Sequence, residues 1–375
     1  MKKAKLFEKV TCIVFCAFIG VMGILYMALP KDTFSETEKR ELADFPVITW
    51  ENIKEGVFAA DLETYMADHM PGRGFFVGVG AYYDLITGQQ GSKGIYRADG
   101  GYLVEAPVRD NEEAKVTMKM KYIQRFADNL GAQVDFMLVP SAGFMLEDSI
   151  KGIHNDYLDD EIIESIYALA GENINCFDLL SVLQAVEEPA NLYYRTDHHW
   201  TSYGAYLTCA AYMESLGREY PAQDFFTVES YDGFRGSTYS RSALWLTKAE
   251  TVELWHGSDI LVETGSSEYP HPGAFYKDRL KEADMYTVYL DGNQPIVHIY
   301  NENNVGKGKI LVVRDSYSNC LGSFLAESYE EVILVDLRYY HNSISDLVAE
   351  EGVDRVLILY SLGNFMTDGN IPFLR

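Results

Sequence analysis

Four short and largely apolar runs constrain the fold of this 375-residue chain more than any other feature. They occupy residues 134–140, 309–313, 331–335 and 355–360. Runs of this kind form strands that are buried on both faces, as in a parallel sheet. The last three alternate with helical stretches at 320–328 and 344–351, which is the order of βαβ crossovers. We therefore expect an α/β fold with a central parallel sheet and functional residues beyond the carboxyl ends of its strands.

Other patterns add helices and a hairpin. Apolar spacing predicts helices over residues 58–70, 116–130 and 202–216, and turn signals predict a hairpin formed by residues 94–96 and 101–104. Residues 233–242 and 265–273 are rich in loop-forming residues, and we expect them to belong to an irregular insertion over the site.

The amino terminus has the pattern of a membrane anchor. Lys2, Lys3, Lys5 and Lys9 flank an uncharged apolar run at residues 10–29. A helix of this length spans the ~30 Å apolar core of a bilayer, and its positive flank stays in the cytoplasm. A cleaved signal peptide is the alternative, but its apolar region is usually about 7–15 residues long and ends at a small-x-small site that is not clear here.

These features predict the organisation of the chain. We expect a cytoplasmic tail at 1–9, a transmembrane anchor at 10–29, a juxtamembrane helical segment at 30–93 and an α/β domain at 94–375, the last two outside the cytoplasm. The 31 Lys and Arg against 56 Asp and Glu give a net charge of −25, which disfavours nucleic-acid binding. Of five cysteines, three lie outside the apolar run, and an odd number implies no disulfide framework.

Two clusters contain residues suited to nucleophilic catalysis. The first is residues 193–201, which place Asp197, His198 and His199 just before a predicted helix. In the second, Ser316 follows a predicted strand and precedes another helix. A serine at a strand-to-helix turn exposes its Oγ and aims its own N–H at an oxyanion.

The spacing within the first cluster assigns a role to each residue. A serine nucleophile needs an imidazole base, and the imidazole needs a carboxylate that fixes its tautomer. Side chains alternate in an extended segment, so Asp197 and His199 share a face and His198 points elsewhere. We therefore predict Ser316 as the nucleophile, His199 as the base and Asp197 as the orienting acid.

These residues resemble a known family. Residues 196–200, Thr-Asp-His-His-Trp, look like the hallmark of the DHHW family, SGNH-hydrolase-like relatives of the alginate O-acetylation proteins. Residues 315–317 are similar to the Gly-Asp-Ser block that carries the SGNH nucleophile, and residues 362–364 resemble the block whose Asn donates to the oxyanion. The resemblance implies a three-layer SGNH-hydrolase-like fold with permuted motif order, and it assigns Asn364 to the oxyanion hole. Residues 36–46, 68–71 and 94–103 also look like family features.

Two positions depart from the SGNH pattern. Arg314 replaces the glycine before Asp-Ser, and residues 337–340 contain no glycine where the pattern has one to donate an N–H. The implied oxyanion hole therefore consists of the Ser316 N–H and Asn364 alone. Removing one oxyanion donor typically lowers turnover about 10²–10³-fold. The sequence is therefore also compatible with a slow or degenerate enzyme.

The resemblance also implies a function. It points to serine-dependent transfer of acyl groups, acetyl in particular, to a cell-envelope or exported polysaccharide. Because no donor-binding motif is visible, it further implies an acyl donor delivered by a multi-spanning membrane acyltransferase, and we expect no cofactor. A carbohydrate esterase of the same fold and a noncatalytic glycan-binding or assembly protein with a degenerate triad are the alternatives.

Simpler roles stay open for individual residues. Asp197, His198 and His199 could ligate a metal, although adjacent histidines rarely reach one ion from an extended segment. Ser316 could be only a helix N-cap, and Asn364 only a turn residue. We predict no metal site and assign no substrate-binding residue.

Overall fold

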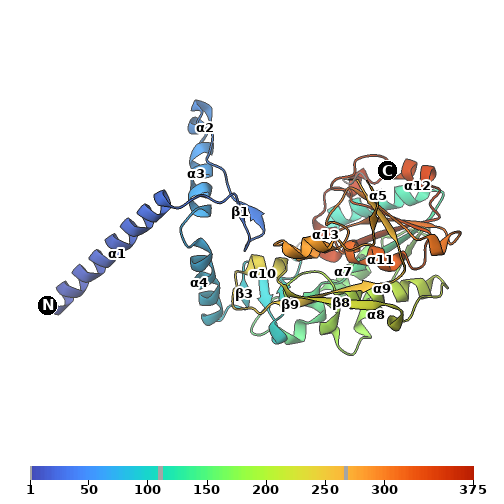
Figure 1. Ribbon diagram of the computed structural model, residues 1–375, viewed down its shortest axis with the longest axis horizontal. Helices are drawn as coiled ribbons and strands as arrows, with labels where there is room; N and C mark the ends of the chain where they lie inside the picture. Colours follow the sequence, from blue (N-terminus) through green and yellow to red (C-terminus); the bar gives the residue numbers. More distant parts are fainter. Residues whose placement is uncertain (1, 109–112, 266–268) are drawn as a thin grey trace. The chain divides into compact units, whose positions relative to one another are not determined.

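The computed structural model describes residues 2–108, 113–265 and 269–375. The chain forms two compact units, one of residues 1–87 with 243–245 and the other of residues 88–242 with 246–375. Figure 1 traces both along the sequence. The boundary expected between residues 93 and 94 stays a prediction, and each unit is described by itself.

The first unit consists mainly of helices. They are α1 (Lys2–Ala28), α2 (Trp50–Glu55), α3 (Val57–Asp68) and α4 (Arg73–Ile86), and two short strands, β1 (Phe34–Ser35) and β2 (Arg40–Glu41), pair antiparallel. Helix α3 confirms the helix predicted over residues 58–70. Among the described residues, one helical segment, Leu6–Ala28, is long and apolar enough to cross a membrane.

An ion-pair cluster holds the segment around the first strands to α3. The Asp68 carboxylate, at the end of α3, accepts hydrogen bonds from the Arg40 guanidinium and from the backbone N–H of Ala43. Glu38 pairs with both Arg40 and Arg73. The hydrogen bond from Arg40 outweighs burial and holds the pKa of Asp68 at about 2. Residues within two of the segments that resemble family features thus contact one another.

The second unit contains an eight-stranded sheet in the order β11-β10-β12-β14-β13-β15-β6-β7. The strands are β6 (Gln133–Val139), β7 (Ile174–Cys176), β10 (Leu261–Thr264), β11 (His271–Pro272), β12 (Ile296–Tyr300), β13 (Lys309–Arg314), β14 (Glu331–Val335) and β15 (Arg355–Ser361). The four predicted strands lie side by side and parallel at its centre, with β7 parallel to β6. Strands β12, β10 and β11 extend the sheet antiparallel, so it is mixed.

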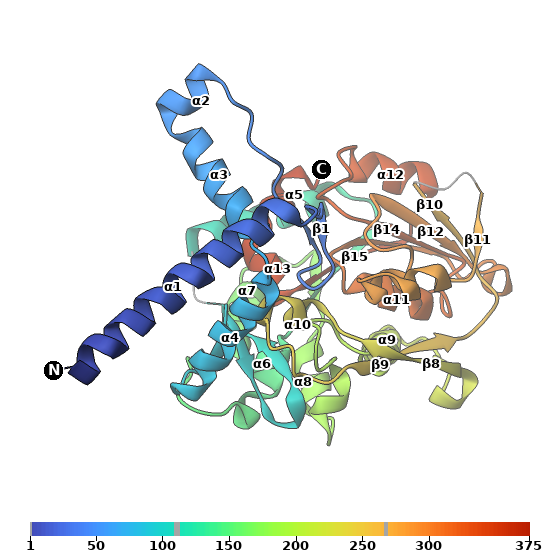
Figure 2. The same ribbon diagram turned by 60° about the vertical axis from the view of Figure 1, so that its left-hand side comes forward.

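Helices cover both faces of this sheet. One side carries α6 (Ala142–Met145), α8 (Leu179–Gln184), α9 (Ser202–Ser215) and α11 (Ser318–Leu325), and the other carries α5 (Glu113–Asn129), α7 (Asp159–Tyr167), α12 (Ile344–Glu351) and α13 (Leu362–Thr367). Figure 2 shows α5 and α12 on one side and α9 and α11 on the other. Because side chains alternate along a strand, Val312 joins one core and Val313 the other. The expected three-layer α/β fold is confirmed.

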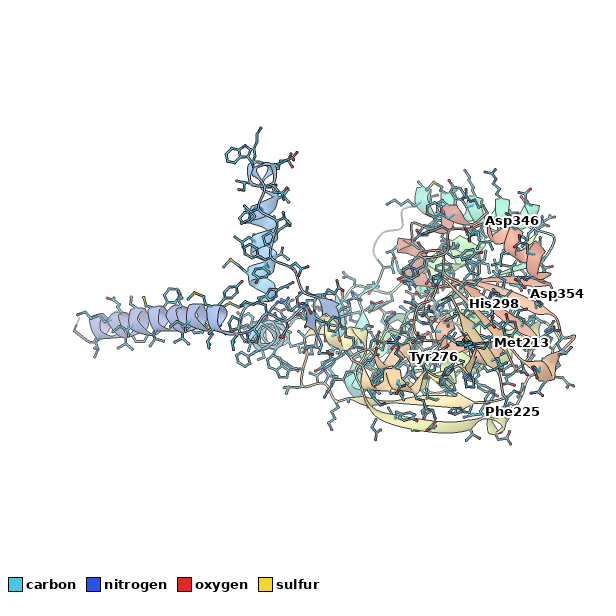
Figure 3. The ribbon with its side chains drawn as sticks, turned by 45° about the horizontal axis from the view of Figure 1, so that its top comes forward. Met213, Phe225, Tyr276, His298, Asp346 and Asp354 are labelled. Atoms are coloured by element: carbon cyan, nitrogen blue, oxygen red, sulfur yellow. The ribbon has the colours of Figure 1, made fainter. Side chains whose placement is uncertain are left out.

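Side chains follow this layering. Met213 on α9 is fully buried in the core, whereas Phe225 in the segment after that helix is 48 % exposed (Figure 3). Asp346 lies on the exposed face of α12, which begins at a Ser343 cap and ends at Gly352, where φ is 66°. Amphipathic helices thus bury one face against the sheet.

Smaller elements surround the central sheet. Strands β3 (Gly91–Ser92), β4 (Ile95–Arg97) and β5 (Leu103–Glu105) form a small antiparallel sheet, which confirms the predicted hairpin. Residues 233–242 were expected as loop, but they contain the end of β8 (Thr227–Phe234) and the helix α10 (Ser237–Ser242). Strand β8 pairs with β9 (Glu250–His256). Its largely exposed residues gave no apolar pattern from which a strand could be predicted. Part of the second expected loop, residues 266–268, lies outside the described residues.

Candidate active site

The turn between β13 and α11 presents Ser316. The strand ends at Arg314 and the helix begins at Ser318, so the serine lies in a turn of three residues. The backbone N–H of Asn319 donates to the Ser316 carbonyl at 3.1 Å, which keeps this turn tight. Among the described residues, none accepts a hydrogen bond from the Ser316 N–H. That donor stands at the amino end of α11, where the helix dipole favours negative charge.

Residues 193–201 form a closed loop before α9. Tyr193 and Trp200 pair as an isolated bridge, and the Tyr194 N–H donates to the His199 carbonyl at 3.1 Å. The loop is bent instead of extended. Asp197 and His199 nevertheless turn toward each other. The Nδ1 atom of His198 lies 2.6 Å from Oγ of Ser237 and 3.4 Å from Oδ1 of Asp197, so the alternation expected of an extended segment does not describe this loop.

The structure brings Asp197, His199 and Ser316 together. The Nδ1 atom of His199 lies 2.6 Å from Oδ1 of Asp197, and its Nε2 lies 2.7 Å from Oγ of Ser316. All three residues are buried, with 9 % of Ser316 exposed. An imidazole thus lies within hydrogen-bond reach of a hydroxyl and of a carboxylate at once, which is the geometry that activates a serine.

The Asp197 carboxylate is fully occupied and charged. Burial opposes its ionisation, but the two neighbouring imidazoles and hydrogen bonds from His199 and Ser237 outweigh burial and hold its pKa well below the usual value. The Ser237 N–H donates to Oδ2 at 2.7 Å, and the His199 N–H donates to Oδ1 at 3.0 Å. A carboxylate fixed in this way accepts a hydrogen bond from Nδ1–H of His199. The unprotonated Nε2 then faces Ser316 as the hydrogen-bond acceptor.

Close approach of α10 to this carboxylate depends on a glycine. A Cβ atom at Gly236 would lie 2.2 Å from Cβ and Oδ2 of Asp197. The Gly236 N–H also donates to the Thr196 hydroxyl at 3.1 Å. Only a residue without a side chain lets the backbone N–H of Ser237 reach Asp197.

Glu250 on β9 holds the other end of the loop. Its carboxylate accepts the backbone N–H groups of Arg195 and Thr196 at 2.8 and 2.7 Å, and the Thr196 hydroxyl as well. Burial raises the pKa of Glu250, although these hydrogen bonds oppose the effect. A single side chain therefore fixes the two residues that precede Asp197.

Two tyrosines, Tyr286 and Tyr317, pack around the imidazole. The Tyr286 ring stacks on His199, with ring centroids 3.8 Å apart and planes at 4°. Trp200 is buried and donates from Nε1 to the Tyr317 carbonyl at 3.1 Å, so this tryptophan has a packing role. These contacts restrict the ring of His199 to one orientation.

Asp315 joins the serine turn to the end of β15. Its Oδ2 accepts hydrogen bonds from the N–H and hydroxyl of Ser361 and from the Asn364 amide, each at 2.8 Å. Asn364, the residue assigned to the oxyanion hole, thus lies one hydrogen bond from the residue that precedes Ser316. One Nδ2 hydrogen points to Asp315, and the amide has a second. Its role in an oxyanion hole stays a prediction.

Arg314, where the SGNH pattern has glycine, is fully buried. Its guanidinium donates to the Asn319 side chain and to the Gln294 carbonyl. Burial lowers its pKa to about 10, against the attraction of Asp336. The arginine therefore braces the first turn of α11 from inside the fold.

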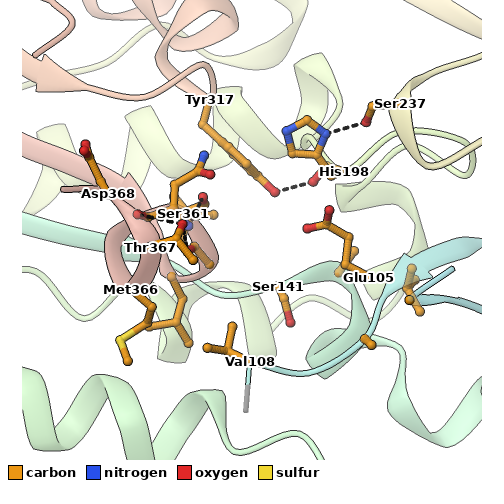
Figure 4. Close-up of a pocket in the computed structure, with 18 of the residues that line it drawn as sticks. Glu105, Val108, Ser141, His198, Ser237, Tyr317, Ser361, Met366, Thr367 and Asp368 are labelled. Carbon is orange, nitrogen blue, oxygen red and sulfur yellow. Dashed lines mark hydrogen bonds between the residues drawn. The ribbon is translucent and has the colours of Figure 1, made fainter. Parts of the chain in front are cut away.

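His198 contacts a different set of partners. Its Nδ1 lies 2.6 Å from Oγ of Ser237, and its backbone carbonyl accepts the Tyr317 hydroxyl (Figure 4). With Tyr317, Ser361 and Asn364 it lines a pocket of about 1000 Å³ next to the serine turn. Burial and the neighbouring His199 lower the pKa of His198, against the attraction of Asp197.

Asp197, His198 and His199 also offer a possible ligand set for a metal ion, with one atom of each within 4.8 Å of the others. The same atoms already bond within the protein. Oδ1 of Asp197 contacts Nδ1 of His199, and Nδ1 of His198 contacts Ser237. The arrangement fits a proton relay, in which imidazole and carboxylate are partners of each other.

Several of these residues were not predicted from the sequence. Gly236, Ser237 and Glu250 lie in or near segments without a chemical motif, and Tyr286 belongs to the 3-10 turn Met285–Val288. Each acts through long-range contacts to the loop of residues 193–201. Only the loop-rich composition of residues 233–242 hinted at an insertion near the site.

The fold is that of an SGNH hydrolase-like domain. Residues 100–235 match the family model described as "SGNH hydrolase-like domain, acetyltransferase AlgX". The match includes Asp197 and His199 and ends before Ser316. The match supports the resemblance read from residues 196–200.

Solved structures share the fold. A DHHW family protein from Eubacterium siraeum has a TM-score of 0.65 and 22 % identity, covering 76 % of this chain and 97 % of that one. Bacillus cereus PatB1 has a TM-score of 0.62 and 20 % identity, covering 74 % of this chain and 98 % of that one. PatB1 was also solved with a sulfonyl adduct, at 0.63 and 19 %, with coverage of 75 % and 98 %. At such identities the likeness concerns the fold alone. No curated protein sequence matches this chain.

Proposed function

We propose that this protein is a serine-dependent O-acyltransferase that places acetyl groups on a cell-envelope or exported polysaccharide. The observation that carries the proposal is the contact of His199 with both Ser316 Oγ, at 2.7 Å, and Asp197, at 2.6 Å. The match of residues 100–235 to an acetyltransferase family supports the choice of acyl group.

The reaction runs in two steps. In the first, His199 Nε2 takes the Ser316 proton while Oγ attacks the acyl carbonyl, and the donor's leaving group departs with that proton. In the second, a sugar hydroxyl attacks the acyl-serine, gives its proton to His199, and releases Ser316. Asp197 keeps His199 in the required tautomer and stabilises the imidazolium in both steps.

The oxyanion forms next to the amino end of α11. We assign the Ser316 N–H and the Asn364 amide as its donors. The Ser316 N–H has no acceptor among the described residues, and Asn364 has one amide hydrogen beyond that given to Asp315. Donors fixed before the reaction stabilise the developing charge without reorganisation.

The proposed location of the protein in the cell rests on the amino terminus. We propose that residues 1–9 lie in the cytoplasm, that residues 10–29 anchor the chain, and that residues 30–93 and the α/β domain at 94–375 lie outside the cytoplasm. The apolar helix Leu6–Ala28 supports the anchor. We further propose a multi-spanning membrane acyltransferase as the source of the acyl group, since acetyl donors of the cytoplasm do not cross a bilayer unaided.

The test uses the full chain in detergent micelles with p-nitrophenyl acetate as acyl donor. Ser316→Ala and His199→Ala should each abolish ester cleavage, and a sulfonyl fluoride should label the wild type but not Ser316→Ala. The matched control is Ser318→Ala, which removes the hydroxyl at the start of the same helix and should retain activity. Cleavage that survives in Ser316→Ala would remove this serine from the mechanism.

The same assay separates the alternatives. An esterase would release acetate and form no acetylated sugar when an oligosaccharide is present. A noncatalytic glycan-binding protein would show neither cleavage nor labelling, and would bind oligosaccharide equally with Ser316→Ala.

A further inference from the structure

The pocket beside the serine turn has no assigned occupant. It measures about 1000 Å³ and lies within the second unit, between β5, α10, α13 and the serine turn. Pockets of this size hold ligands as large as a few sugar rings. At one end His198, Ser237 and Tyr317 gather, with Met366 and Val108 at the opposite end (Figure 4).

His198 is held rigidly at the wall of this pocket. Its Nδ1 contacts Ser237 Oγ at 2.6 Å, and its ring packs against His199 with centroids 3.8 Å apart. Its carbonyl accepts the Tyr317 hydroxyl, so the backbone is fixed as well. The side chain is nonetheless 26 % exposed. Figure 4 shows its second nitrogen on the side of the ring away from Ser237.

That second nitrogen, Nε2, has no hydrogen-bond partner in the part of the chain that the structure describes. A neutral imidazole carries one donor and one acceptor, so Nε2 offers a polar contact in either tautomer. A hydroxyl can both donate and accept, and it fits either form. The positive charge of Arg241 at the same end is already compensated, because its guanidinium is ion-paired with the Glu105 carboxylate. This end therefore suits a neutral polyol better than a free anion.

The position next to His199 gives this contact a function. His199 becomes positively charged when it takes the proton of an attacking hydroxyl, and a second charge 3.8 Å away would oppose it. A neutral His198 can bind the attacking hydroxyl, or its neighbour on the same sugar, without that repulsion. A water molecule is oriented less by such a contact than a sugar hydroxyl is, because the sugar ring is also held by the rest of the pocket.

We propose that the pocket is the acceptor subsite for a neutral sugar and that His198 orients its hydroxyl toward the acyl group on Ser316. This inference rests on the proposed acyl transfer. The acceptor oxygen forms the new ester bond to the acyl carbon, and the bond to Ser316 Oγ breaks. The acceptor proton passes to His199 Nε2 and then to Ser316 Oγ. His198 thereby raises transfer to sugar relative to hydrolysis.

The test measures how the acyl-enzyme partitions. The full chain in micelles is given p-nitrophenyl acetate with cellopentaose, xylopentaose and mannopentaose, and nitrophenol, acetate and acetylated sugar are quantified. His198→Ala should lower the ratio of transfer to hydrolysis at least about tenfold, the effect of one lost orienting hydrogen bond. His198→Gln, which keeps a polar group at that place, should restore part of it. The control is the exposed His341→Ala, which should match the wild type.

The outcomes separate the two proposals. If the wild-type protein cleaves no ester at all, the proposed function itself is overturned. Ester cleavage that depends on Ser316, without acetylation of any of the three sugars, overturns the acceptor subsite and leaves an esterase. If folded His198→Ala and His198→Gln lost transfer and hydrolysis equally, the ratio of the two would not depend on His198. His198 would then only hold His199 in position, and the inference would be wrong. Thermal melting establishes that each variant is folded.

Discussion

Tyr286 lies flat against His199, with ring centroids 3.8 Å apart and ring planes at 4°. The tyrosine comes from a 3-10 turn that precedes β12, far in sequence from the loop that carries the histidine. Its hydroxyl is buried and has no hydrogen-bond partner among the described residues. Burial raises its pKa well above the usual value, so the phenol stays neutral. The ring, not the hydroxyl, is therefore the part that acts on His199.

This relationship predicts different effects for two substitutions. Tyr286→Phe keeps the stack and removes an unsatisfied buried hydroxyl, so it should leave turnover within about twofold and stabilise the protein by up to about 1 kcal/mol. Tyr286→Leu removes the stack, lets the imidazole tilt, and should lower turnover about 10- to 100-fold. Rates on p-nitrophenyl acetate and thermal melts measure both. Similar activity in the two variants would mean that the stack does not hold the imidazole.

The contact of Gly236 with Asp197 gives the second prediction. Gly236→Ala would place a methyl group 2.2 Å from the carboxylate, which must then move away from the Ser237 N–H. Loss of the correct tautomer of His199 should lower turnover about 10²-fold or more. Gly131→Ala is the matched control, because no atom lies within 4 Å of its added methyl group. A Gly236→Ala enzyme with normal turnover would show that the carboxylate tolerates the shift.

The central sheet was predictable for a physical reason. Runs such as residues 309–313 must be buried on both faces, and few folds other than a parallel sheet can bury them so. The pairing of Asp197 with His199 was inferred from alternation in an extended segment, whereas the loop that brings the two side chains together is bent. The inference about the sheet needs no knowledge of distant residues.

The support of the site was not predictable in the same way. Glu250, Gly236 and Tyr286 act through contacts across 39 or more residues of sequence, and none of them belongs to a local pattern. The exposed strand β8 has polar residues on much of its length, so apolar alternation did not mark it. Antiparallel β12 was missed because its half-buried side chains include His298 and Tyr300.

The first unit supplies a prediction about pH. The pKa of Asp68 is held at about 2 by the hydrogen bond from Arg40, against an ordinary value of 3.8. A lowered pKa in the folded state stabilises the protein above the unfolded pKa, and this contribution is lost as the pH falls from about 4 through about 2. Asp68→Asn should therefore lower stability at pH 7 by about 1–3 kcal/mol, and the difference from wild type should shrink in that window.

Melting in detergent at several pH values between about 2 and 7 measures this difference. Asp278→Asn serves as the control, because Asp278 pairs with Lys281 at the surface, where both side chains are at least 80 % exposed. Such a pair contributes little, so its loss should leave the melting temperature nearly unchanged. A constant difference between wild type and Asp68→Asn down to pH 2 would contradict the lowered pKa.

Glu250 provides the last prediction, because its two carboxylate oxygens accept three hydrogen bonds from Arg195 and Thr196. In Glu250→Gln one of these oxygens becomes an NH₂ group that faces N–H donors. The buried donors then lose acceptors, at a cost of about 1–3 kcal/mol, and the loop that carries Asp197 loosens. In this variant turnover should fall, whereas the KM for the ester should change less, because Glu250 does not contact the acyl donor. Glu253→Gln on the same strand is the control and should stay within about 0.5 kcal/mol of wild type. If Glu250→Gln lost stability but kept full turnover, Glu250 would support the fold without positioning Asp197.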